Sequence, residues 1–146
     1  MLLLVVSTVV RAQQSPNSEN SDSSNIYYST LRNYFGNMRG EKKVLIEQND
    51  FLFPFLRYQF DTTGFEFVDR LQIISKAKKQ NGLTVYRIIP LKINTSSELY
   101  VSIIQFTVHY KKGKLEFINN GGGKVYYGYD CSNKIYQYLR TQNVVL

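Results

Sequence analysis

The segment Leu99–Tyr110 limits the fold of this chain more than any other part of the sequence. It reads LYVSIIQFTVHY, is rich in β-branched and aromatic residues, and is apolar on both faces over its centre. A strand with one wet face would alternate between apolar and polar residues, so this pattern favours a strand with neighbours on both sides. The chain is therefore predicted to build a sheet with this segment in its interior.

Other segments supply the neighbouring strands and turns. Apolar residues share one parity between Leu83 and Ile93, and the dipeptide Asn81-Gly82 before them favours a hairpin because both residues tolerate positive φ. The Lys111-Lys112-Gly113 segment predicts a tight turn, and Asn119–Gly123 a flexible connection. Further strands are expected around Phe65 to Ile73, followed by a polar stretch at Ser75–Gln80, and at Leu115–Ile118 and Val125–Tyr129.

Helices are predicted at both ends of the folded part. Tyr27, Leu31, Tyr34, Phe35 and Met38 lie on one helical face, which Gly40 can end. Near the C-terminus, Ser132 can cap a short helix with Ile135, Tyr136 and Leu139 on its inner side. Between these ends, Val44–Ile46 fits a strand or a helix face, and the run Phe51–Leu56 contains Pro54, which favours an edge segment or a loop.

Together these segments predict an α+β fold: an N-terminal helix packed on a curved four- to five-stranded antiparallel meander, with a short C-terminal helix. This order of elements resembles the outline of cystatin-like and NTF2-like folds. The resemblance concerns shape and implies no function. The Gln-x-Val-x-Gly loop expected of cystatin inhibitors is absent, and Gln105-Phe106-Thr107-Val108 has the wrong spacing.

The first 25 residues differ in composition from the rest. Residues 1–12 contain the apolar run Leu2–Val10 and end at Ala12, which is typical of a signal peptide, although no basic residue precedes the run. Residues 13–25 are polar and rich in Ser and Asn, which predicts a disordered linker. Residues 26–146 are expected to form one α+β domain. The protein is thus predicted to be exported, as a periplasmic or secreted protein without a transmembrane segment in the mature chain.

The expected domain is basic. From Ile26 onward the sequence has 17 Lys or Arg and 9 Asp or Glu, a net charge of +8. In a meander the Asn81-Gly82 and Lys111-Lys112-Gly113 turns lie at the same end of the sheet. Six lysines are then predicted to share one ligand-binding rim that suits a polyanion, such as an acidic glycan, a lipid headgroup or nucleic acid; they are Lys76, Lys78, Lys79, Lys111, Lys112 and Lys114. The alternative is that these lysines only keep the hairpin ends soluble.

No catalytic, cofactor or metal motif is predicted. A Cys131–His109 pair oriented by Asp130 would require contacts that the sequence cannot show, and one His with one Cys cannot form a usual zinc site. Asn119–Lys124 resembles a phosphate loop but precedes a predicted strand instead of a helix. Asn94-Thr95-Ser96 is a glycosylation sequon in a predicted turn.

Carboxylates and tyrosines give two further candidates. Glu66 with Asp69, and Glu98 with Glu116, could pair only through tertiary structure. A C-terminal tyrosine cluster suits either stacking on sugars or bases, or ordinary packing of a strand; it contains Tyr126, Tyr127, Tyr129, Tyr136 and Tyr138.

These observations favour an exported non-enzymatic binding or interaction domain of unknown partner. The alternative is a small NTF2-like enzyme with a pocket between helix and sheet, in which a carboxylate or His109 would lie beside buried tyrosines. A filled layer between the helix and the sheet would favour the binding domain, and a deep polar pocket would favour the enzyme.

Overall fold

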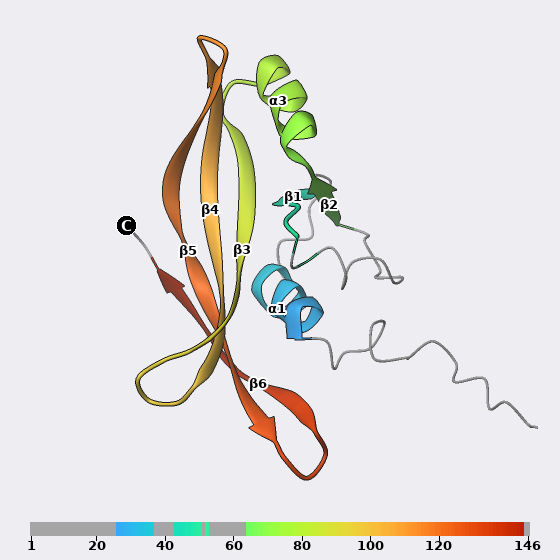
Figure 1. The fold of residues 1–146 in the computed structure, drawn as a ribbon, viewed down its shortest axis with the longest axis vertical. Coiled ribbons are helices and arrows are strands. Elements are labelled where there is room, and N and C mark those ends of the chain that lie inside the picture. Colours follow the sequence, from blue (N-terminus) through green and yellow to red (C-terminus); the bar gives the residue numbers. More distant parts are fainter. Residues whose placement is uncertain (1–25, 37–42, 51, 53–63, 145–146) are drawn as a thin grey trace, which may run out of the picture.

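The computed structural model describes residues 26–36, 43–50, 52 and 64–144, which form an α+β fold with one six-stranded sheet and, in that part of the chain, two helices. Figure 1 shows the sheet as a long, curled layer. In chain order the elements are α1 (Ile26–Phe35), β1 (Val44–Glu47), β2 (Phe65–Val68), α3 (Arg70–Lys79), β3 (Leu83–Ile93), β4 (Leu99–Lys111), β5 (Lys114–Asp130) and β6 (Ile135–Val144).

The sheet is mixed, with strand order β2-β1-β3-β4-β5-β6. The antiparallel meander from β3 to β6 follows the predicted type of pairing, but β1 is parallel to both β2 and β3. The prediction of a purely antiparallel sheet of four or five strands was therefore wrong. Helix α3 connects β2 to β3 as a crossover, so these two strands run in the same direction, with β1 between them. A tight turn cannot join parallel strands in this way.

Helix α3 replaces the strand and polar stretch predicted for Leu71 to Gln80. Asp69 caps the helix: its carboxylate accepts from the Gln72 N–H at 2.8 Å, and the Gln72 side chain accepts from the Asp69 N–H at 2.9 Å. Ile73 and Ala77, four residues apart, form the buried side. This reciprocal capping box stabilises a helix start. Asn81-Gly82 consequently joins a helix to β3 and is not a hairpin turn.

The predicted C-terminal helix is instead the strand β6. The Asp130 carboxylate accepts from the backbone N–H groups of Ser132 and Asn133, which holds a turn after β5. The returning chain then pairs Tyr136 with Tyr129 across the two strands. Leu139 has no partner in this register and forms a bulge. The spacing of the apolar residues therefore fits a helix, although the segment is a bulged strand.

Glycines 121–123 lie inside β5, and the flexible connection predicted for Asn119–Gly123 was also wrong. β5 runs without a break from Lys114 to Asp130, and its register against β4 shifts between Ile104 and Phe106. Gly122, with φ +150°, lies at this bulge. A glycine run here permits a bent strand close to its neighbour.

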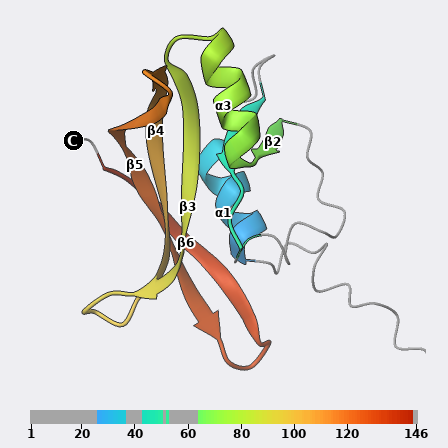
Figure 2. The same cartoon turned by 45° about the horizontal axis from the view of Figure 1, so that its top comes forward.

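The two helices pack at different places along the sheet. In Figures 1 and 2, α3 lies beside the end of β3 into which it leads, and α1 lies toward the other end of β3. The core has two clusters of buried apolar side chains, one with residues of α3 and one with residues of α1. The cluster at α3 contains Val85 of β3, whereas the cluster at α1 contains Ile88, with Tyr86 packed against it. Since successive side chains of a strand point to opposite faces, the helices pack on opposite faces of the sheet. We call these the α1 face and the α3 face.

The N-terminal helix is confirmed in α1, with Leu31 and Phe35 buried as predicted. Val44–Ile46, which fitted either a strand or a helix, belongs to strand β1. The predictions for residues 1–12 and 13–25, for Met38 and Gly40, and for Pro54 lie outside the described residues. Of the helices that are described, none has the length and apolar character needed to cross a membrane.

Candidate anion-binding surface

The structure places the six candidate lysines at one end of the sheet, in what we call the lysine rim. Lys76, Lys78 and Lys79 lie in the last turn of α3, which leads into β3. Leu83 at the start of β3 pairs with Val108 near the end of β4. The Nδ1 atom of His109 lies 2.9 Å from Oδ1 of Asn81, which ties the α3–β3 connection to β4. The α3 lysines and the β4–β5 turn are therefore neighbours (Figure 1).

Acidic groups neutralise two of the six lysines. Lys76 Nζ lies 2.9 Å from Glu66 Oε1, and Lys111 Nζ lies 3.3 Å from Glu116 Oε2. Lys78 Nζ lies over the Tyr110 ring, 4.9 Å from its centroid. The other three are exposed and have no ion-pair partner among the described residues: Lys79, Lys112 and Lys114. The rim therefore keeps a positive charge.

The β4–β5 turn sets the spacing of its lysines. Lys112 has φ 49° and Gly113 has φ 81°. Positive φ at both central residues is the geometry of a type I′ hairpin turn. Lys111 and Lys114 then stand opposite each other as a cross-strand pair. Like charges in such a pair repel, so this arrangement lowers stability slightly.

A second group of cations lies over aromatic rings farther along the same sheet face as α3. The Arg87 guanidinium lies 4.9 Å from the Phe106 centroid, and Lys124 Nζ lies 4.9 Å from the Tyr100 centroid. These pairs could not be predicted from the sequence, because the partners come from different strands and only the cross-strand register brings them together.

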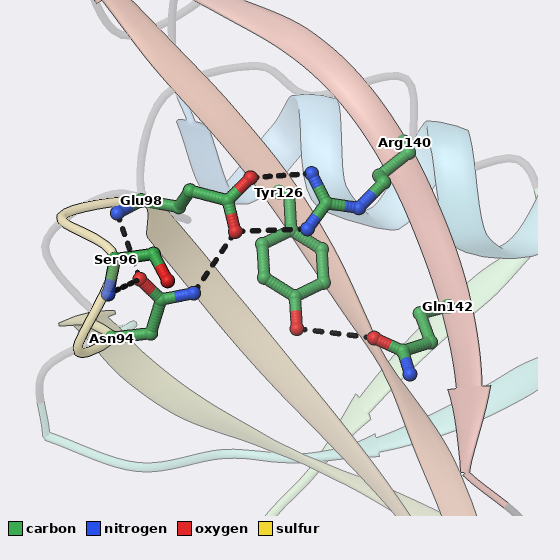
Figure 3. A network of polar contacts seen from close by, with 6 residues as sticks. All are labelled: Asn94, Ser96, Glu98, Tyr126, Arg140 and Gln142. Atoms are coloured by element: carbon green, nitrogen blue, oxygen red, sulfur yellow. Dashed lines mark hydrogen bonds and ion pairs between the residues drawn. The ribbon is translucent and has the colours of Figure 1, made fainter.

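Arg140 makes the closest of these contacts and is held from two sides (Figure 3). Its Cζ atom lies 3.9 Å from the Tyr126 centroid. Its two terminal nitrogens donate to Glu98 at 2.6 and 2.9 Å. The Glu98 carboxylate also accepts from Asn94 Nδ2 at 2.9 Å. Hydrogen bonds from Arg140, and next from Asn94, lower the pKa of Glu98 to about 2. The Arg140 charge is thus neutralised locally.

The sequon asparagine is part of this network. Asn94 Oδ1 accepts from the backbone N–H groups of Ser96 and Glu98, at 3.0 and 2.8 Å. Its Nδ2 atom, the position of glycan attachment, donates to Glu98. Attachment of a glycan there would leave this nitrogen with a single N–H.

His109 and Cys131 lie at opposite ends of β5. His109 pairs with Glu116 near the start of β5, while Cys131 is exposed just after its end at Asp130. A strand rises about 3.3 Å per residue, so the two side chains are on the order of 40 Å apart. The structure does not bring the hypothetical Cys–His pair together.

The suggested carboxylate pairs are also separated. Glu66, Glu98 and Glu116 each bind a different basic side chain, while Asp69 caps α3. No group of three or more His, Cys, Asp or Glu among the described residues could hold a metal ion.

The layer between α1 and the sheet contains buried apolar side chains and one pair of hydroxyls. Thr30 Oγ1 lies 2.8 Å from the hydroxyl oxygen of Tyr127 and donates to the Ile26 carbonyl at 2.7 Å. Burial raises the pKa of Tyr127. Apart from the buried tyrosines, Thr30 is the only polar residue that is buried in the described part. His109 contacts Asn81 at the lysine-rim end of the sheet, away from this layer.

The C-terminal tyrosine cluster divides between core and surface. Tyr126 and Tyr127 are buried, Tyr136 is half-buried, and Tyr129 and Tyr138 are about half exposed. The rings of Tyr129 and Tyr136 pack 5.1 Å apart across the β5–β6 pair.

In comparisons with protein-family models, curated proteins and solved structures, no match to this chain was found.

Proposed function

We propose that this chain is a non-enzymatic binding domain that acts after export and holds a polyanionic partner at its lysine rim. The observation that carries the proposal is the charge left uncompensated at one end of the sheet by Lys79, Lys112 and Lys114. Clustered cations raise the local concentration of anionic partners and speed their association. The apolar layer beneath α1 supports a binding role over the alternative of an enzyme pocket.

The partner is an acidic glycan, an anionic lipid surface or nucleic acid, which share closely spaced negative charges. Lys78 lies over the Tyr110 ring and Lys111 forms an ion pair with Glu116, so both lysine side chains are partly ordered before binding. Contacts of this kind are mostly electrostatic, and binding should therefore weaken steeply as the salt concentration rises.

A charge-matched pair of variants tests the proposal. The rim variant carries Lys78→Gln, Lys79→Gln, Lys114→Gln and Lys112→Asn. The control variant carries Lys43→Gln, Lys92→Gln, Lys124→Gln and Lys134→Asn. Each set removes four charges. Each also contains one lysine that lies over a tyrosine ring and one with positive φ, where Asn is tolerated.

The measurement is the salt concentration that elutes each protein from immobilised heparin. Phosphatidylglycerol vesicles and a single-stranded oligonucleotide serve as the lipid and nucleic-acid arms. The rim variant should elute well before the control variant, and the arm with the largest difference identifies the class of partner. Equal elution of the two variants on all three would show that only the net charge matters, and the proposed function would be wrong.

A further inference from the structure

The strand β6 is the longer of the two edge strands of the sheet. The opposite edge strand, β2, has 4 residues, whereas β6 has 10. An edge strand presents backbone N–H and C=O groups that can pair with another chain, and proteins usually protect long edges with charged side chains. The only charge in β6 is Arg140, which Glu98 neutralises.

Exposed apolar side chains gather around this edge. Eight large hydrophobic side chains are exposed in the described part of the chain, and five of them lie on β6 or opposite it on β5. These five are Tyr129, Ile135, Tyr138, Leu139 and Val144. A cluster of exposed apolar side chains marks an interaction surface, whereas isolated ones are ordinary.

The ends of β5 and β6 also extend beyond the rest of the sheet. The pairing of β4 with β5 ends at Leu99, the first residue of β4, which lies opposite Tyr127. Gly128–Asp130 and Ile135–Gln137 continue past this point as a two-stranded ribbon (Figure 1). A bulge at Leu139 separates the ribbon from the remainder of β6, so two short stretches of edge are available.

The two faces beside β6 differ in chemistry. Register places Arg140 beside Tyr126, and Gln142 beside Lys124, on the α3 face. On the α1 face, Tyr138 lies beside Tyr127 and its ring is 6.5 Å from the Tyr127 ring. Side chains of a strand added to β6 would alternate between these faces. On the α3 face they would meet polar side chains together with the exposed Ile135 and Val144, and on the α1 face they would meet tyrosine rings.

Charge argues against a second copy of this chain as the added strand. The chain carries a net charge of +7, so it repels a second copy and attracts a segment that carries acidic residues. The one carboxylate of the ribbon turn, Asp130, already accepts hydrogen bonds from Asn133, Ser132 and Gln137. We propose that β6 binds, as a seventh strand, an extended segment of another protein in which acidic residues alternate with apolar ones. Main-chain hydrogen bonds would supply affinity and the two faces specificity.

The test uses a fluorescein-labelled peptide of alternating Glu and Val, seven residues long, and the same peptide with Lys for Glu. Binding is measured by fluorescence anisotropy, and hydrogen exchange reports on the backbone of β6. The Glu peptide should bind at least tenfold more tightly than the Lys peptide and slow exchange at β6 amides. Equal binding of both peptides, or unchanged exchange in β6, would overturn the proposal.

Paired variants locate the surface. Tyr138→Ser with Leu139→Ser should weaken peptide binding at least fivefold. The control, Leu71→Ser with Ile93→Ser at more exposed positions elsewhere, should leave it unchanged. Hydrogen exchange without peptide checks that each variant is folded. If the rim variant loses the peptide while the β6 variant keeps it, the lysine rim binds the peptide and the β6 proposal fails. Concentration-dependent dimerisation that protects β6 would likewise overturn it, by showing that the occupant is a second copy.

Discussion

Replacing Gly122 by Ala tests whether the glycine run belongs to a strand. A methyl group at this position would lie against the carbonyl oxygen of Ile103, and 3.0 Å from both the Ile103 carbonyl carbon and the Ile104 Cα atom. All three are backbone atoms of β4, so no side-chain rotation relieves the contact. In a flexible connection the same substitution would meet open space.

Two effects determine how much the free energy of unfolding falls in Gly122→Ala. The φ of +150° is a conformation that L-residues rarely adopt, and such a residue costs about 1 to 3 kcal/mol. Overpacking against a neighbouring element adds about 1 to 3 kcal/mol. The lower entropy of Ala in the unfolded chain returns about 0.4 to 1 kcal/mol. We therefore expect Gly122→Ala to lower the free energy of unfolding by about 3 kcal/mol.

Urea unfolding followed by circular dichroism measures this change. With a slope of about 2 kcal/mol per molar urea, the midpoint should fall by roughly 1.5 M. Gly113→Ala is the control, because Gly113 has φ 81° but no atom within 4 Å of the added methyl group. It should lose only about 1 kcal/mol. If Gly122→Ala unfolds within about 0.5 kcal/mol of the parent protein, the bulged strand is wrong and the segment is the flexible connection that the sequence suggested.

Two further predictions concern single side chains. Arg140→Gln should raise the pKa of Glu98 from about 2 toward its ordinary 4.5, as measured by carboxyl NMR; an unchanged pKa would show that Arg140 does not hold this carboxylate. Because the folded-state pKa is depressed, the contribution of Glu98 to stability is present above pH 4.5 and is lost as the pH falls toward 2. Cys131→Ser should change the free energy of unfolding by less than about 0.5 kcal/mol, because the thiol is exposed; a larger loss in urea unfolding would contradict this surface position.

The local sequence pattern was sufficient to predict the elements whose type does not depend on tertiary contacts. Leu99–Tyr110 is apolar on both faces because the α1 core covers one face, at Val101 and Ile103, and the α3 core covers the other, at Val108. The prediction of α1 is confirmed because Leu31 and Phe35 lie one turn apart on a helix with one buried side. In both cases the periodicity of the sequence reflects burial directly, so it predicts the element.

Tertiary structure decided the elements in which two patterns overlap. Ile135, Tyr136 and Leu139 fit one helix face, but pairing with β5 and the bulge at Leu139 make them part of a strand. Leu71 and Ile73 alternate like a strand, yet the cap at Asp69 and burial of Ile73 with Ala77 make them helical, with Leu71 exposed. A few residues carry too little periodicity to distinguish spacings of two and 3.6.

The lysines of the rim are visible in the sequence, but their state depends on contacts between distant residues. Glu66 reaches Lys76 from a different element, and only the cross-strand register shows that Arg140 lies over Tyr126. The composition determined that the chain is basic. The fold decided which charges are paired, because ion pairs depend on distances of a few ångströms between elements that are far apart in the chain.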